Sequence, residues 1–171
     1  MNWVAARVAA GVGLLALMLT GCLGYRLGPV TETRYKSIAV PVFRNRTVQP
    51  QLEAIVANAI IERLQQDGSL LVQNRSTADA VLFGTITGYT RQPVRGTRTD
   101  TGIPREYRVT MTAVVEVLDQ RTGKHILKPT TFEGHAETFI GSDLQSADEQ
   151  IIPLLAEDLA RQITAQLTEP W

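Results

Sequence analysis

Apolar side chains recur every three or four residues in two stretches of this 171-residue chain, and this spacing predicts two amphipathic helices. The first stretch, residues 50–67, is followed by Gly68, which stands where a helix would end. The second begins at Ser146, which opens a sequence that fits a capping box. Because Pro153 lies inside the second pattern, either the helix is kinked there or its regular part starts near that residue. The apolar positions are Leu52, Ile55, Val56, Ala59, Ile60 and Leu64 in the first stretch, and Ile151, Leu155, Leu159, Ile163 and Leu167 in the second.

Between the two helices the apolar spacing falls to every second residue, which is typical of β-strands. The clearest case is residues 107–118, where one face is apolar and the other is mostly polar. The apolar face holds Tyr107, Val109, Met111, Ala113, Val115 and Val117, and the other face holds Arg108, Thr110, Thr112, Val114 and Glu116. The polar face either meets water or meets the polar lumen of a barrel, and the sequence alone favours water.

Further strand patterns cover residues 37–43, 70–73, 78–89 and 126–139. Pro41 suggests that the first of these lies at an edge or a bulge, and Gly84 and Gly88 suggest a bulge or bend in the third. Lys128-Pro129 interrupts the last one. The segment from Phe43 to Pro50 is expected to be a loop.

The order of elements is therefore strand, helix, strands, helix, which predicts an α+β fold. We expect one domain in which two amphipathic helices pack on one face of a mostly antiparallel, mixed sheet of about four strands. The apolar stripe of each helix and the apolar face of the sheet would form the core.

The N-terminal segment has a different pattern. Arg7 and the amino terminus supply positive charge, residues 8–19 are mostly apolar, and Thr20-Gly21 precede Cys22, the only cysteine. This arrangement is that of a signal peptide, and the apolar run is too short to favour a permanent transmembrane helix. Leu-Thr-Gly-Cys resembles the lipobox of bacterial lipoproteins, which implies that Cys22 is acylated and becomes the mature N-terminus. The alternative is an ordinary cleaved signal with a chance cysteine near the cut.

These features divide the chain into a signal peptide at residues 1–21, an acylated N-terminal tether at 22–36 and one domain at 37–171. Acyl chains on Cys22 would hold the protein on a membrane while the polypeptide stays outside the bilayer. In lipoproteins of diderm bacteria, Asp after the cysteine favours retention in the inner membrane; here that residue is Leu23. We therefore expect a lipid-anchored protein on the periplasmic side of the outer membrane.

Charge and motif content exclude several function classes. The chain holds 17 Lys and Arg against 17 Asp and Glu, so it lacks the basicity of a nucleic-acid binder. The histidines, His125 and His135, have no ligand cluster at metal spacing around them in the sequence, and no serine lies in a nucleophile elbow. The glycines form no phosphate loop or dinucleotide fingerprint. We expect a protein that is not an enzyme and needs no cofactor or metal.

Several short motifs together resemble the LptE family of outer-membrane lipopolysaccharide-assembly lipoproteins. They are the lipobox, Gly24-Tyr25-Arg26-Leu27, the IAVPVF strand, the first helix, EYRVTMTAVVEVLD and the final helix with ADEQ. The resemblance implies a non-enzymatic partner that sits as a plug inside a large outer-membrane β-barrel of the LptD kind. It also implies help with assembly of that barrel and contact with lipopolysaccharide.

A long basic loop, residues 90–106, is the unusual local feature. It holds Arg91, Arg95, Arg98 and Arg105 against two acids, Asp100 and Glu106. Arginine is suited to bidentate phosphate contacts and lipid A carries phosphates, so we predict contact with lipopolysaccharide or the partner there. The equally plain reading is a solvated hairpin loop. The residues before the final helix, 141–150, supply acids and no Lys or Arg, which weakens the lipid-binding part of the resemblance more than the barrel-partner part.

Two other functions suit a small tethered α+β domain. One is an outer-membrane lipoprotein facing the periplasm that regulates a peptidoglycan synthase, and the other is a carrier of a small apolar ligand. The short tether disfavours the regulator, because a chain extends by at most about 3.5 Å per residue.

Overall fold

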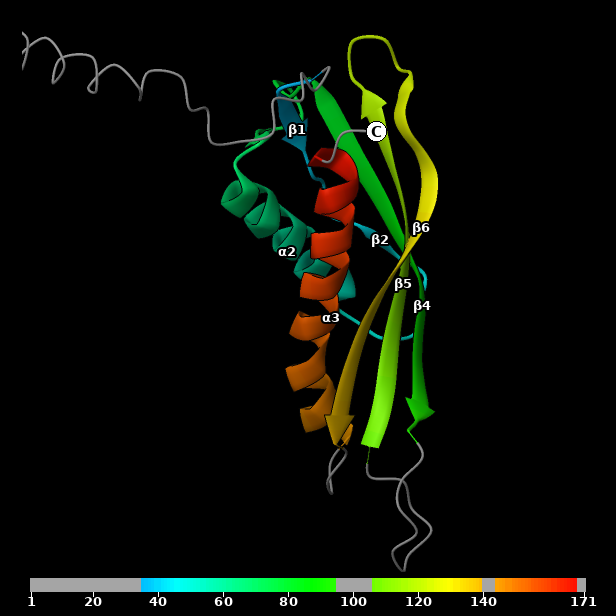
Figure 1. Cartoon of the computed structure of the whole chain (residues 1–171). Coiled ribbons are helices and arrows are strands. Elements are labelled where there is room, and N and C mark those ends of the chain that lie inside the picture. The colour runs from blue at the N-terminus through cyan, green and yellow to red at the C-terminus, as the bar shows by residue number, and fades with distance from the viewer. Residues whose placement is uncertain (1–34, 95–105, 140–143, 169–171) are drawn as a thin grey trace, which may run out of the picture. The chain divides into compact units, whose positions relative to one another are not determined.

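The computed structural model describes residues 35–94, 106–139 and 144–168, which belong to one compact unit of the chain, Thr31–Trp171. The side chains of Phe139 and of residues 144–146 are not described. The elements, in chain order, are β1 (Ser37–Ala39), β2 (Arg44–Asn45), α2 (Leu52–Asp67), β3 (Leu71–Val72), β4 (Ala80–Pro93), β5 (Glu106–Asp119), β6 (His125–Phe139) and α3 (Leu144–Thr168). Figure 1 shows both helices on one side of the sheet formed by the long strands.

The strands form one mixed sheet in the order β3-β1-β4-β5-β6, and β2 pairs with β4 off this path. β4, β5 and β6 are joined as antiparallel neighbours, whereas β1 pairs in parallel with β3 and β4, and β2 pairs in parallel with β4. The parallel pairs follow from α2, because a helix between two strands returns the chain to the same end of the sheet. The α+β class, the two helices and the mixed sheet are confirmed, but the expected count of about four strands is wrong: the sheet described has six.

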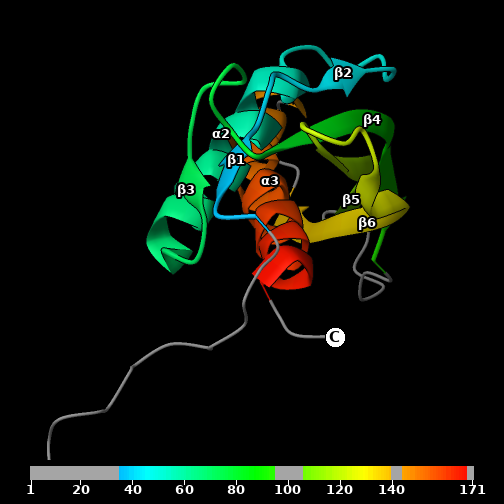
Figure 2. The ribbon, with the colours of Figure 1, turned by 90° about the horizontal axis from the view of Figure 1, so that it is seen from above.

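The core lies between the helices and the sheet, and Figure 2 shows α2 and α3 together on that side. The side chains that the sequence assigned to the buried face of β5 are fully buried, except Tyr107, which is partly exposed. In α2, Ile55 and Ala59 are only partly buried, while the remaining stripe positions are inaccessible to solvent. The predicted core positions that are fully buried are Leu52, Val56, Ile60, Leu64, Val109, Met111, Ala113, Val115, Val117, Leu155, Leu159 and Ile163, and Ile151 is 1% exposed.

Two glycines allow elements to approach more closely than any other residue would. A Cβ atom on Gly134 in β6 would lie 2.5 Å from the carbonyl oxygen of Leu155 and 2.9 Å from Cγ of Leu159, both in α3. A Cβ atom on Gly84 in β4 would lie 2.0 Å from the ring of Phe43. The bulge expected near Gly84 and Gly88 lies between Ile86 and Gly88, where the β4–β5 register shifts. Gly84 is therefore not part of the bulge, and its lack of a side chain makes room for the Phe43 ring.

Several predicted boundaries need correction. The strand predicted over residues 37–43 ends at Ala39, and the predicted loop after it contains β2. Residues 40–43 do not continue the strand pairing of β1, and the Phe43 side chain is buried, with 4% of it exposed. Lys128-Pro129 does not break the last strand, since β6 runs continuously and absorbs the proline through register shifts opposite Val115 and Val117.

The final helix also differs from its prediction. α3 begins at Leu144, so Ser146 lies inside the helix and is not its cap. The helix continues through Pro153, which rules out a start near that residue. Proline removes one helical hydrogen bond, but its ring is exposed and buried side chains lie on both sides of it, Ile151 and Ile152 before and Leu155 after. Packing against the sheet thus holds the helix together across Pro153.

The start of β1 is tied to the start of β4 by a side-chain cluster. Asp79 Oδ2 accepts hydrogen bonds from the amides of Lys36 and Ser37, at 3.1 and 3.0 Å, and from the Ser37 hydroxyl at 2.8 Å. The Asp79 amide in turn donates to Ser37 Oγ at 2.9 Å. These bonds, that of the Ser37 hydroxyl first, hold the pKa of Asp79 below its ordinary value. Tyr35, which the sequence assigned to the tether, is 7% exposed and belongs to the core, and burial raises its pKa to about 12.

The outer edge of β6 is covered in part by side chains from α3. The His135 amide donates to Asp158 Oδ2 at 3.0 Å, and Gln162 Nε2 donates to the Glu133 carbonyl at 2.9 Å. Gln162 also donates to Asp158 Oδ2 at 3.1 Å, and Arg161 pairs with Asp158 Oδ1. Because free edge groups invite pairing with another strand, these contacts protect the sheet.

Candidate functional site

Of the basic loop predicted from the sequence, the structure describes residues 90–94 and 106, at one end of the β4–β5 hairpin. Both strands run longer than predicted: Pro93 pairs with Tyr107, and the Val94 amide donates to the Glu106 carbonyl at 2.9 Å. β4 and β5 are thus antiparallel neighbours along their whole length. Arg95, Arg98 and Arg105 fall outside the described residues, as does Cys22.

Arg91 is a strand residue of β4 and forms a bidentate ion pair with Asp148 in α3. Its Nε donates to Asp148 Oδ1 at 3.2 Å, and its Nη2 pairs with Oδ2. The Tyr89 hydroxyl donates to the same Oδ1 at 3.0 Å, and the Arg91 guanidinium lies over the Tyr89 ring, 5.0 Å from its centroid. The carboxylate of Asp148 therefore occupies the guanidinium fork that a phosphate would use.

Burial and charge reinforce this cluster. The pKa of Tyr89 is raised above its ordinary value, first by desolvation and then by its hydrogen bond to Asp148. The pKa of Arg91 is raised by its hydrogen bond to the same carboxylate. The Asp148 side chain is 15% exposed and that of Arg91 is 34% exposed. The pair thus ties the end of β4 to the first part of α3 and offsets the charge of Arg91.

Two cross-strand pairs lie at the same end of the sheet, on the face that carries no helix. Arg108 Nη2 contacts Glu137 Oε1 at 2.7 Å, and Thr110 Oγ1 lies 3.1 Å from His135 Nδ1. Both pairs join β5 to β6. Sequence reasoning placed Arg108 and Thr110 on the polar face but did not find their partners, because strand register is not visible in a single strand.

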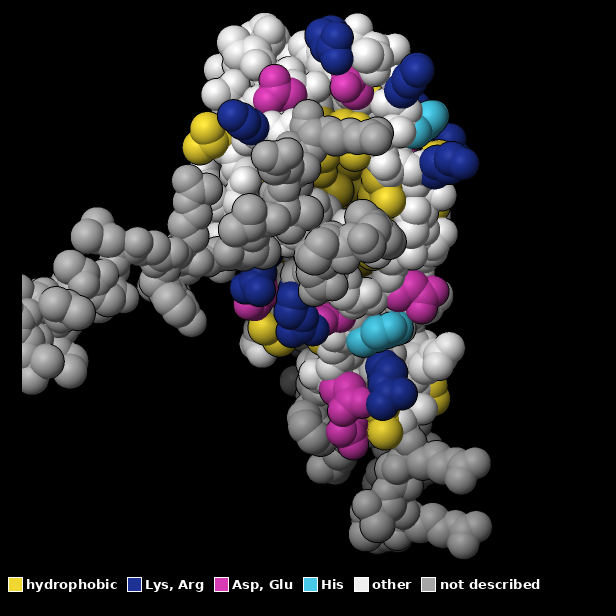
Figure 3. Space-filling view, turned by 45° about the horizontal axis from the view of Figure 1, so that its top comes forward, with side chains coloured by type: hydrophobic (Ala, Val, Ile, Leu, Met, Phe, Trp, Pro, Cys, Tyr) yellow, Lys and Arg dark blue, Asp and Glu magenta, His cyan; other side chains and the backbone are white. Residues whose placement is uncertain are grey.

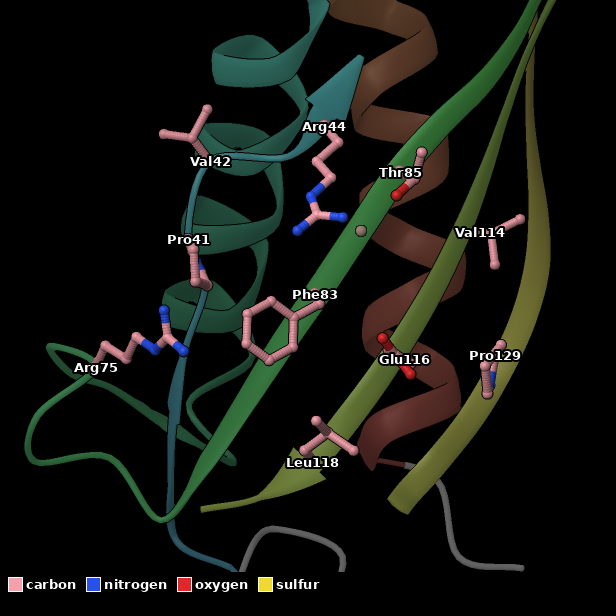
Figure 4. Close-up of a pocket in the computed structure, with 11 residues that line it drawn as sticks. Pro41, Val42, Arg44, Arg75, Phe83, Thr85, Val114, Glu116, Leu118 and Pro129 are labelled. Atoms are coloured by element: carbon pink, nitrogen blue, oxygen red, sulfur yellow. The ribbon is translucent and has the colours of Figure 1, made fainter. Parts of the chain in front are cut away.

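Further along this face, five segments of the chain surround an open groove. Its lining includes Val42 and Arg44 beside Phe83 of β4, with Val114 and Glu116 of β5 across from them (Figure 4). Sequence reasoning did not find this groove. The one signal was Val114, an apolar residue on the otherwise polar face of the predicted strand.

Charge elsewhere is mixed. Among the described residues on the face shown in Figure 3, basic and acidic side chains lie among one another with no large patch of one sign. His125 Nδ1 lies 3.5 Å from Glu116 and His135 Nε2 lies 3.8 Å from Glu133, so each histidine faces one carboxylate. Within the described residues no group of three or more His, Cys, Asp or Glu side chains is arranged to hold a metal ion. Of the helices described there, none has the length and apolar character needed to cross a bilayer.

The fold is a small α+β domain, and it is similar to the folds of several lipoproteins of known structure. A minor lipoprotein from Acinetobacter baumannii superposes with a TM-score of 0.53 at 18% identity, covering 79% of this chain and 94% of that one. A putative lipoprotein from Caulobacter crescentus CB15 gives 0.51 at 14% identity, covering 75% and 93%. The PelC dodecamer from Paraburkholderia phytofirmans gives 0.50 at 18% identity, covering 84% and 94%. At these identities the likeness concerns the fold alone.

The sequence profile of the LptE family, described as "Lipopolysaccharide-assembly", matches residues 35–167, which include β1 and nearly all of α3. The chain therefore belongs to the LptE family, as the motifs indicated. No curated protein matches it.

Proposed function

We propose that this chain is an outer-membrane lipoprotein that partners a β-barrel lipopolysaccharide-assembly protein of the LptD kind and sits inside it as a plug. The observation that carries this proposal is the family match, which spans the described fold from Tyr35 to Leu167. The LptE family consists of non-enzymatic lipoproteins that act in lipopolysaccharide assembly, so the role is one of binding and support.

The architecture suits a plug. Both helices use their apolar stripes in the domain's own core, which leaves one face of the sheet and the loops for contact with a partner. β4 has 14 residues and so carries its hairpin end about 45 Å from the end at which β1 starts, at roughly 3.3 Å per residue. If the N-terminus holds the protein at a membrane surface, a strand pair of this length would allow it to contact a partner far from that surface.

The anchor of this proposal is Cys22. Acyl chains on its thiol and on the new amino terminus would hold the protein on the outer membrane, since several chains together bind firmly where one would not. Mass spectrometry of the purified protein should show a mature N-terminus at Cys22 with acyl mass. Cys22→Ala should lack that mass, whereas a wild-type chain that begins elsewhere would contradict the assignment.

The lipopolysaccharide contact is proposed at the hairpin end. Arg95, Arg98 and Arg105, which lie between β4 and β5 in the sequence, would supply the positive charge, and guanidinium groups bind phosphate through paired hydrogen bonds. Arg91 would contribute only when its contact with Asp148 opens, because that carboxylate fills its fork. For this reason Arg91 is not included with Arg95, Arg98 and Arg105 in the proposed phosphate contact.

Binding of purified lipopolysaccharide to the full chain in detergent tests the contact. Reversal of Arg95, Arg98 and Arg105 to Glu should weaken binding and reduce its dependence on salt, because exposed charges are screened within about 8 Å at physiological ionic strength. The control is Arg121→Glu, because Arg121 is exposed in the turn at the opposite end of β5; this change should leave lipopolysaccharide binding intact. If binding is unchanged while recovery with the barrel falls, the loop is a protein contact. If neither changes, it is a solvated hairpin.

A pull-down from detergent-solubilised outer membrane tests the partnership itself. The expected result is recovery of a large β-barrel with the wild-type chain. Recovery of a peptidoglycan synthase instead would support the regulator, and recovery of a bound apolar small molecule without a barrel would support the carrier.

A further inference from the structure

The groove on the helix-free face has a defined floor and two sides. Phe83 and Thr85 of β4 and Val114 and Leu118 of β5 form the floor, and Figure 4 shows Pro129 of β6 at its far side. Pro41, Val42 and Arg44 lie along the opposite side, on the connection between β1 and β2 and on β2 itself. Phe83 packs against a small second cluster on this face, formed by Ala39, Ala78 and Val81.

Two arginines in this groove have no acidic partner within the described part of the chain. Arg44 and Arg75 are exposed, and no ion pair joins either of them to a described carboxylate. Arg75 lies over the Phe83 ring, 5.2 Å from its centroid, which holds the guanidinium at the groove. The acid in the lining, Glu116, faces His125 at 3.5 Å on the neighbouring strand. The lining therefore holds two guanidinium groups without an ion-pair partner on one side and one carboxylate, that of Glu116, on β5.

The apolar part of the groove is accessible. Val42 is 65% exposed, although an apolar side chain gains stability from burial, and Phe83, Val114 and Leu118 are only partly buried. On β5, Val114 and Leu118 share this face with Glu116 between them, and Phe83 of β4 pairs with Glu116. Side chains on one face of a strand recur at every second residue. A segment in extended conformation has the same period.

The form of the groove favours a polypeptide over a lipid chain. Pockets for small apolar ligands enclose most of the ligand surface. Here the lining comes from one face of a sheet and from two adjoining parts of the chain, residues 41–44 and Arg75, so a ligand would lie across an open surface. An extended segment that lies along the strands buries one row of its side chains on the floor and turns carboxylates toward Arg44 and Arg75.

We infer that this groove, here called the β2–β5 groove, docks an extended acidic segment of the partner protein in which apolar residues alternate with Asp or Glu. The inference rests on the proposed function, because it takes the partner to be the outer-membrane barrel. It assigns a contact surface distinct from the hairpin end, where Arg91 lies.

Photo-crosslinking in cells tests the groove. A photo-crosslinking residue is placed at position 42 in the groove, and the matched control is placed at position 154, where Leu154 of α3 is 54% exposed. The expected result is an adduct between position 42 and the barrel, whose crosslinked peptide carries alternating acidic and apolar residues. Arg44→Glu with Arg75→Glu should reduce this adduct at least about tenfold, while Arg63→Glu, exposed on α2, should leave it intact. Both charge variants should unfold at the wild-type temperature.

Each alternative outcome has a separate meaning. An adduct between position 42 and lipopolysaccharide would overturn the inference in favour of a lipid. A barrel adduct from position 154 alone would overturn the groove assignment and leave the proposed function standing. Failure of both positions to crosslink, together with failure of the barrel to copurify, would overturn the proposed function as well.

Discussion

Replacement of Gly134 by alanine tests whether the close contact between β6 and α3 is required by the fold. The new Cβ atom would lie 2.5 Å from the Leu155 carbonyl oxygen, 2.9 Å from Leu159 Cγ and 3.3 Å from the Leu159 amide nitrogen. Two of these atoms belong to the helix backbone, which cannot rotate away as a side chain does. α3 must therefore move as a body, and the fully buried Leu155 and Leu159 must repack with it.

Overpacking of this kind costs about 1–3 kcal/mol in free energy of unfolding. For a domain of this size the cost corresponds to a fall in Tm of roughly 3 to 15 °C. Urea unfolding of the full chain in detergent, followed by far-ultraviolet circular dichroism, measures the free energy, a thermal scan measures Tm, and the slope with urea should stay unchanged.

The matched control is Gly88→Ala in β4. Its Cβ atom would meet only the side chain of Thr112, at 3.3 Å, on the helix-free face, so the free energy of unfolding should stay within about 1 kcal/mol of wild type. A Gly134→Ala protein as stable as Gly88→Ala would refute the account of how β6 packs on α3.

Three further changes test other parts of the structure. Leu159→Asp should unfold the domain, at a cost on the order of 4 kcal/mol or more, because it buries an unpaired charge; a folded variant that has lost only its partner would make α3 the interface. Asp158→Ala with Gln162→Ala should expose the β6 edge and raise the share of dimers or aggregates in light scattering, whereas a variant that stays as monomeric as wild type would contradict edge protection. The pKa of Asp79 is lowered in the folded state, so its contribution to stability is present above the unfolded pKa of about 3.9 and is lost as pH falls through the folded pKa. The Tm of the wild type should therefore approach that of Asp79→Asn at acid pH. A difference in Tm that stays constant with pH would argue against this.

The parts of the fold that follow a local period were predictable. β5 shows strict alternation and α2 a clean three- and four-residue spacing, because each buries one face against a single layer. β2 escaped prediction since it has only two residues, Arg44 and Asn45, which is too short for any period. Gly134 was likewise not identified, because its role depends on a helix about twenty residues further along the chain.

The candidate site was predictable only in part, for the same reason. The sequence singles out Arg91 as a basic residue, but its partner Asp148 lies 57 positions away, and only strand lengths and helix placement bring the two together. The β2–β5 groove draws on five separate segments, so no single motif marks it. Pairings between distant residues of this kind are set by tertiary packing, which local patterns do not encode.

Native mass spectrometry of the complex isolated from outer membrane in detergent tests the central claim most directly. The account predicts one species that contains one barrel and one copy of this chain, with the chain beginning at an acylated Cys22. A chain that emerges without a barrel, or joined to a different protein, would contradict it.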